Sequence, residues 1–94
     1  MDCAEILVSK HALRRMFQRA IPMAEAVGVV RSGRIIEEYP DDSPWPETVV
    51  LGETSRGPIH VVVGRDPSTG RCVMITVYWP DHTRWDDEFR RRRS

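Results

Sequence analysis

The sequence has no long apolar run, and this absence narrows the classes of protein that it can belong to. Runs such as Ile6–Val8 and Val61–Val63 are three residues long, far below the ~20 residues that a membrane-spanning helix needs. Met1–Glu5 carries acids where a secretory signal would carry basic residues. We therefore expect a cytoplasmic protein that does not cross a membrane.

Cysteine and metal-binding motifs are also scarce. Cys3 and Cys72 are far apart in the sequence and form no C-x-x-C motif, which excludes a zinc knuckle or redox pair of that type. We expect both thiols to stay reduced, with Cys72 packed as a small apolar side chain. His11, His60 and His82 fit neither H-x-x-x-H nor H-E-x-x-H, so we expect no metal and no cofactor.

Lysine is nearly absent as well. Lys10 is the one lysine among 14 basic residues, and the formal net charge is zero. The planar fork of arginine binds phosphate at two points, so the bias suits contact with RNA, although a GC-rich genome explains it equally well. The zero net charge favours a module that docks a protein partner, because proteins that bind RNA broadly are usually basic.

Length and charge together predict one domain followed by a tail. A chain of 94 residues has room for one hydrophobic core, and we expect a single α+β domain over residues 1–89. Four consecutive arginines come next, and residues 90–94 are predicted to form a flexible, arginine-rich tail.

Two helices are predicted near the N-terminus. Ser9 is a suitable N-cap for a helix over residues 10–20, which contain neither glycine nor proline. Its apolar stripe, which we expect to face the core, consists of Leu13, Met16, Phe17 and Ala20. Pro22 then ends this helix and begins a second one, which Gly33 terminates.

The remainder of the chain predicts short strands separated by turn residues. The four expected strands are Arg34–Tyr39, Thr48–Glu53, Pro58–Arg65 and Cys72–Trp79. Because short turns join strands that pair antiparallel, the expected fold class is α+β, with two N-terminal helices packed on one face of a four-stranded antiparallel sheet. The other face would be open to solvent or a ligand.

A cationic ridge is predicted on the first helix. His11, Arg15 and Arg19 recur every four residues and therefore stack along one side. A general base beside guanidinium groups is what cleavage of an RNA phosphodiester needs. The same spacing is also routine on an exposed helical face, so both interpretations stay open.

The last two strands supply the other candidates. His60 lies in an otherwise apolar strand, and alternation points it away from the more apolar side. One face of the last strand is expected to carry Cys72, Met74, Thr76 and Tyr78. If the hairpin pairs His60 with Thr76, both share the open face with Tyr78, whereas a one-residue slip would separate them. A structural role for His60 is the alternative to a catalytic one.

Taken together, these segments resemble the DUF4258 family of small bacterial domains. The resemblance rests on residues 9–16 with Arg19 and Ile21, on Ile35–Asp42, on Ile59–Val63, and on Ile75–Tyr78 with Pro80, Asp81 and Trp85. Members of that family look similar to the RelE-like and MqsR-like messenger RNA interferases and are often encoded beside a zinc-finger antitoxin of the MqsA type. The resemblance implies a metal-independent ribonuclease toxin, a RelE-like fold of helices on an antiparallel sheet, and a zinc-finger antitoxin as partner.

Carried over by position, His11, Arg15 and Arg19 match the helical motif of the family, and His60 and Tyr78 match its strand motifs. We expect an RNA endonuclease in which His60 or His11 removes the 2′-hydroxyl proton. Arg15 and Arg19 would stabilise the transition state, and Tyr78 would orient or protonate. The candidate RNA contacts are Arg14, Thr76, Arg90 and Arg91. The alternative is a non-catalytic protein- or RNA-binding module of the same fold, or an inactive relative that keeps the fold alone.

Overall fold

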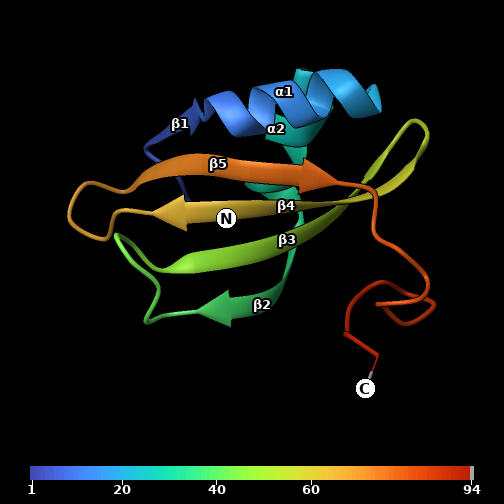
Figure 1. The fold of residues 1–94 in the computed structure, drawn as a ribbon. Helices are drawn as coiled ribbons and strands as arrows, with labels where there is room; N and C mark the ends of the chain where they lie inside the picture. Colours follow the sequence, from blue (N-terminus) through green and yellow to red (C-terminus); the bar gives the residue numbers. More distant parts are fainter. Residues whose placement is uncertain (94) are drawn as a thin grey trace.

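The computed structural model describes residues 1–93 and contains two helices and one sheet (Figure 1). In chain order the elements are β1 (Glu5–Val8), α1 (Lys10–Arg19), α2 (Met23–Ser32), β2 (Arg34–Tyr39), β3 (Glu47–Thr54), β4 (Gly57–Arg65) and β5 (Arg71–Tyr78). Helix α1 begins after Ser9, whose Oγ accepts the Ala12 N–H at 3.0 Å. It ends where Ala20 adopts the left-handed conformation, with φ of 53°.

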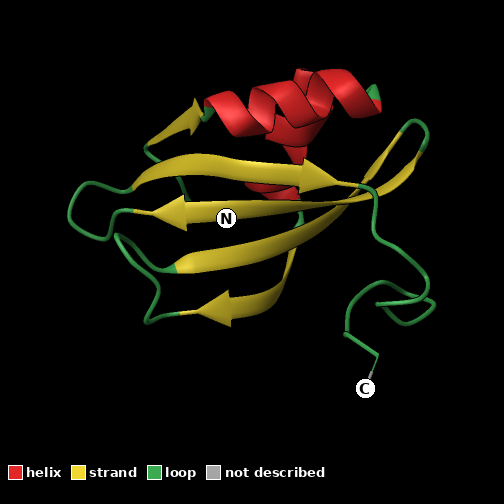
Figure 2. Ribbon diagram, in the orientation of Figure 1, coloured by secondary structure: helices red, strands yellow, loops and turns green. Residues whose placement is uncertain are grey.

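The sheet has five strands in the order β1-β5-β4-β3-β2 (Figure 2). Strands β2 to β5 pair antiparallel with their neighbours, as predicted, but β1 pairs parallel with β5. The prediction of four antiparallel strands was therefore wrong: the sheet is mixed. The missed strand, Glu5–Val8, is four residues long, too short for its alternation to stand out from the preceding N-terminal residues.

Strand β1 leaves half of the β5 edge free, and α1 covers this half. The pairing of β1 reaches only from Arg71 to Met74. Beyond it, Ser9 Oγ donates to the Ile75 carbonyl at 3.1 Å and Arg19 Nη1 donates to the Val77 carbonyl at 2.6 Å. The side chains of the N-cap and of the last residue of α1 thus satisfy carbonyls that another strand would otherwise pair with, and they fix the helix beside the end of β5.

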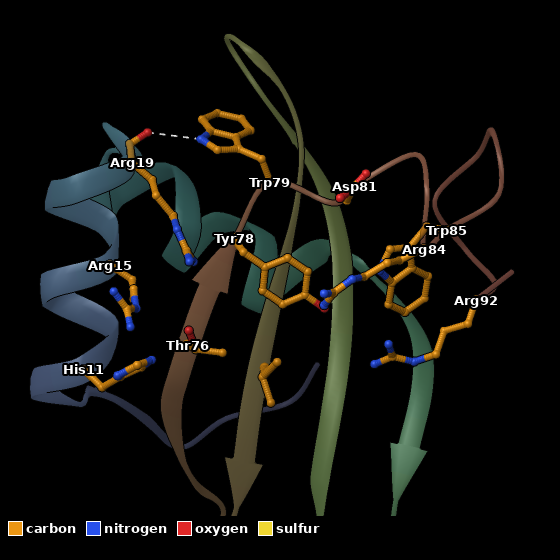
Figure 3. A pocket seen from close by; sticks show the side chains of 11 residues that line it. His11, Arg15, Arg19, Thr76, Tyr78, Trp79, Asp81, Arg84, Trp85 and Arg92 are labelled. Atoms are coloured by element: carbon orange, nitrogen blue, oxygen red, sulfur yellow. Dashed lines mark hydrogen bonds between the residues drawn. The ribbon is translucent and has the colours of Figure 1, made fainter.

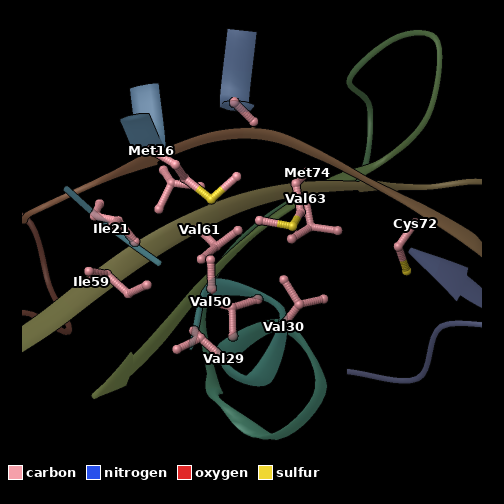
Figure 4. Packing of buried hydrophobic residues seen from close by; sticks show 13 residues of the cluster. Met16, Ile21, Val29, Val30, Val50, Ile59, Val61, Val63, Cys72 and Met74 are labelled. Carbon is pink, nitrogen blue, oxygen red and sulfur yellow. The ribbon is translucent and has the colours of Figure 1, made fainter. Parts of the chain in front are cut away.

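Both helices pack on the same face of the sheet and share one core with it (Figure 4). In α1 the buried side chains are Ala12 and Met16, whereas Leu13 is 51% exposed and Phe17 is 88% exposed. The predicted apolar stripe was therefore wrong in these two members, and Ala20 is exposed as well. Because α1 lies at the sheet edge, only a narrow stripe of it touches the core.

An extra residue in β5 changes which side chains face the helices. Val62 is opposite Thr76, but the next residue, Val63, is opposite Met74. Ile75 is thus bulged out of the pairing. Before the bulge Met74 faces the core, together with Cys72, and after it Val77 does. The prediction that Cys72 and Met74 share a face with Thr76 and Tyr78 was wrong, because the bulge exchanges the two faces between them.

The two cysteines are joined. Cys3 and Cys72 form a disulfide, with their Cα atoms 5.6 Å apart. The expectation of two reduced thiols is therefore corrected. The physical reason is the missed strand: pairing of Ile6 with Cys72 in register brings the residues just before β1 alongside the start of β5.

Neither helix within residues 1–93 combines the length and the apolar character that spanning a bilayer would require.

Candidate functional site

The face of the sheet opposite the helices carries the polar candidates from β4 and β5. His60 is opposite Tyr78 across the hairpin, and Val62 is opposite Thr76. From the sequence, a pairing of His60 with Thr76 was considered, and the observed register differs from it by two residues. Because side chains alternate with a period of two, this shift leaves each side chain on the same face. His60, Thr76 and Tyr78 therefore share one face.

A cavity of about 520 Å³ lies where α1, the end of β5 and the C-terminal segment, residues 80–93, come together. Figure 3 shows the α1 side chains on one side, Arg84 and Arg92 on the other, and Tyr78 between them. Its lining residues are His11, Arg15, Arg19, Val62, Thr76, Tyr78, Trp79, Asp81, Arg84, Trp85 and Arg92. We call this cavity the arginine pocket.

The charge of the arginine pocket is strongly positive. Four of its lining residues are arginines, and Asp81 is the one acid among them. The Thr83 N–H donates to Asp81 Oδ1 at 2.8 Å, and this bond lowers the pKa of Asp81, which stays ionised. An excess of guanidinium groups in one hollow favours an anionic ligand, and their planar forks suit phosphate.

The α1 wall of the pocket presents the predicted ridge. His11 is exposed, and Arg15 is half-buried with its Nη1 donating to Gln18 Oε1 at 2.8 Å. Arg19 already donates to the Val77 carbonyl, so it fixes the helix as well as lining the cavity. His11, Arg15 and Arg19 thus line one cavity, and their joint action on a substrate stays a prediction. Arg14 is exposed and is not among the lining residues.

The opposite wall belongs to the C-terminal segment, which folds onto the sheet. Trp85 is 1% exposed, and its ring contacts His60 with the centroids 4.3 Å apart. The guanidinium of Arg92 lies 4.6 Å from the centre of the Trp85 ring, and Arg92 Nε is 3.1 Å from Glu37 Oε1 of β2. The contacts of Trp85 with His60 on one side and with Arg92 on the other thus fasten this wall to the sheet.

His60 is sealed beneath this wall and does not line the pocket. It is 0% exposed, and both of its ring nitrogens have partners: Nδ1 is 3.2 Å from Tyr78 Oη and Nε2 is 2.7 Å from the Phe89 carbonyl. Burial lowers the pKa of His60, and the bond to the Phe89 carbonyl opposes this effect only in part. The geometry favours the structural role that the sequence left open.

Arg90 and Arg91 are placed away from the arginine pocket. They line a second hollow of about 460 Å³, together with Arg34, Ile35, Ile36, Asp86 and Glu88. Close to them, Arg93 Nε donates to the His82 carbonyl at 2.7 Å, and Arg93 Nη2 is 3.0 Å from Asp87 Oδ1. Residues 90–93 therefore make specific contacts with the segment before them. The flexibility of residues 90–94 stays a prediction, and Ser94 lies outside the described residues.

Six pocket residues were not among the predicted site residues: Val62, Trp79, Asp81, Arg84, Trp85 and Arg92. The last four lie beyond Trp79, where the sequence predicts only a turn and a tail. The signal that could have found them is the alternation of arginine and tryptophan after a strand that carries other candidates. In residues 1–93, no three His, Cys, Asp or Glu side chains gather closely enough to hold a metal ion.

The fold and the pocket define an α+β domain with a cationic cavity between its first helix and its C-terminal segment. Residues 8–79 match the family described as Domain of unknown function (DUF4258), and the chain belongs to that family. Neither the curated proteins nor the solved structures gave a significant match. The match ends before the C-terminal segment, so one wall of the arginine pocket lies outside the matched residues.

Proposed function

We propose that the protein is an RNA endonuclease that needs no metal ion and that the arginine pocket is its active site. The observation that carries this proposal is the placement of His11, the exposed histidine of α1, in one cavity with four arginines. A base that can reach solvent beside a phosphate-binding wall is the arrangement that attack by a 2′-hydroxyl requires.

In this mechanism the His11 imidazole removes the proton of a ribose 2′-hydroxyl. The 2′-oxygen then forms a bond to phosphorus, the bond to the 5′-oxygen of the next nucleotide breaks, and that oxygen takes a proton from water. The products are a 2′,3′-cyclic phosphate and a 5′-hydroxyl. Arg15, Arg84 and Arg92 neutralise the charge that builds on the phosphoryl oxygens.

His60 is assigned no proton transfer, because its two ring nitrogens are engaged and it has no exposed surface. His11 is therefore the base in this proposal, and His60 holds the C-terminal wall in place.

The family resemblance supports the biological setting of the proposal. A likeness to RelE-like and MqsR-like interferases suggests a toxin of a type II toxin–antitoxin pair, with a zinc-finger protein as its antitoxin. Expression of the chain alone in bacteria should then arrest growth, and co-expression of a neighbouring zinc-finger protein should restore it.

The second candidate is a module of the same fold that binds RNA or a protein without cleaving anything. What favours it is the single histidine in the pocket: cleavage by 2′-hydroxyl attack is faster when a second group protonates the leaving oxygen. In addition, Asp81 is held in its ionised form, so it cannot supply that proton.

The test is cleavage of single-stranded RNA in the presence of EDTA by the wild-type chain, by His11→Gln and by the matched control His82→Gln. His82 is also exposed but does not line the pocket. We expect cyclic-phosphate products from the wild type and from His82→Gln, and a loss of roughly 10²–10⁴-fold in His11→Gln, the usual contribution of a general base. A strict need for added Mg²⁺, or full activity in His11→Gln, would contradict this mechanism.

A further inference from the structure

The proton between His60 and Tyr78 can be assigned by counting donors. The Phe89 carbonyl can only accept a hydrogen bond, so the 2.7 Å contact with His60 Nε2 requires a hydrogen on Nε2. A neutral imidazole carries one N–H, and burial favours the neutral form of His60. Nδ1 is therefore without a hydrogen and accepts one.

The partner of Nδ1 is the Tyr78 hydroxyl, 3.2 Å away. Burial raises the pKa of Tyr78, so its hydroxyl keeps its proton, and that proton points to His60. The charged groups that act on His60 are Glu37 and Arg92, which shift its pKa in opposite directions. They are also paired with each other at 3.1 Å, so they leave this assignment unchanged.

Tyr78 lines the arginine pocket and its side chain points across the cavity toward Arg84 (Figure 3), so its hydroxyl offers only lone pairs to a ligand there. The surrounding guanidinium groups are donors without acceptors, and they suit phosphate. A hydroxyl that can only accept, set among guanidinium groups that can only donate, fits a ligand that carries both a phosphate and a nearby hydroxyl. The 2′-hydroxyl of ribose is such a group, and deoxyribose lacks it.

We propose that Tyr78 is a specificity-determining residue that accepts a hydrogen bond from a ribose 2′-hydroxyl, so that the arginine pocket selects RNA over DNA. This inference rests on the proposed function. The attacking hydroxyl has a single proton, which goes to His11 in that mechanism. The hydroxyl that Tyr78 reads therefore belongs to the neighbouring ribose, which carries the leaving oxygen. Tyr78 orients the substrate and is not its proton donor.

The test uses two dinucleotides that cannot be cleaved by 2′-hydroxyl attack, because the first sugar of each is a deoxyribose. In one the second sugar is ribose, and in the other it is deoxyribose. Their dissociation constants are measured by calorimetry for the wild-type chain, for Tyr78→Phe and for the control Tyr39→Phe. Tyr39 also carries a hydroxyl, which donates to Glu37, but it does not line the arginine pocket.

We expect the wild type and Tyr39→Phe to bind the ribose form roughly 2–10-fold more tightly, the usual effect of one hydrogen bond. Tyr78→Phe should bind both forms equally. Equal binding by the wild type, or an unchanged preference in Tyr78→Phe, would overturn the inference while leaving the phosphate site intact. No binding of either dinucleotide would overturn both the inference and the proposed function. A preference for ribose without any RNA cleavage would support the role of Tyr78 in recognising ribose and would contradict the proposed nuclease activity.

Discussion

Trp85 lies against His60, with ring centroids 4.3 Å apart at an interplanar angle of 84°. Trp85 comes from the C-terminal segment and His60 from β4, the first strand of the β4–β5 hairpin, so this contact joins a pocket wall to the sheet. Both side chains are almost fully buried. The shape of the arginine pocket is therefore tied to the stability of a buried aromatic contact.

The stability of the fold should depend on the ionisation of His60. Burial lowers the pKa of His60 below its ordinary value of ~6.5, so the unfolded chain takes up this proton first as the pH falls. The stabilisation is fully present above pH ~6.5 and is lost as the pH drops through the pKa of the folded state. Urea denaturation at about pH 7.5 and about pH 5 should show a larger loss for the wild type than for His60→Gln. Equal losses in the two proteins would contradict this assignment.

Arg15 and Arg14 should differ in their effect on RNA binding although they are neighbours. Arg15 lines the arginine pocket and Arg14 does not. Loss of one phosphate contact should make the slope of log K against log salt shallower by roughly 0.7 for a single strand. We expect this change in Arg15→Gln and none in Arg14→Gln, measured by fluorescence anisotropy with single-stranded RNA. The reverse result would move the RNA to the outer face of α1.

Met16 and Phe17 should also differ, in this case in their effect on folding. Met16 is 3% exposed and Phe17 is 88% exposed. Met16→Ala should cost about 2–5 kcal/mol of unfolding free energy, as truncation of a buried side chain does, whereas Phe17→Ala should change it by less than about 0.5 kcal/mol. Chemical denaturation measures both. A large loss of unfolding free energy in Phe17→Ala would show that Phe17 faces the core, as the sequence predicts.

The disulfide should contribute to stability through the length of chain that it closes. Cys3 and Cys72 are separated by 69 residues in the sequence, and disulfides typically contribute about 2–4 kcal/mol. Cys3→Ser should lower the unfolding free energy of the unreduced protein by this amount, and reductant should destabilise the wild type but not the variant. Alkylation of both cysteines without prior reduction would show that the bond is absent.

Much of the fold can be predicted from the sequence because its signals are local. Strand Arg34–Tyr39 was predicted at its observed bounds, and the N-cap Ser9 and the terminator Gly33 were recognised from residue type. Strand β1 was missed because only its partner β5 defines it. The buried side of α1 was misjudged for a related reason: an apolar stripe indicates which residues can be buried, and the neighbouring strands decide which are.

The candidate site was predictable in the half that lies on regular elements. His11, Arg15 and Arg19 follow from helical spacing, and Tyr78 from strand alternation. The C-terminal wall was not predicted, because nothing periodic links Arg84 or Arg92 to the sheet; contacts between residues distant in the sequence place them. The burial of His60 has the same origin, since the segment that covers it begins after the last strand.

Because of the extra residue at Ile75, the length of β5 decides which of its side chains face the helices and which face the arginine pocket. Removing one residue there would carry Thr76 and Tyr78 to the side of the helices and would turn Val77 outward. A deletion at this point would therefore disrupt the lining of the arginine pocket and the packing of the core in a single event. A substitution in β5 can alter its pocket face or its core face alone, whereas a change in the length of the strand alters both faces at once.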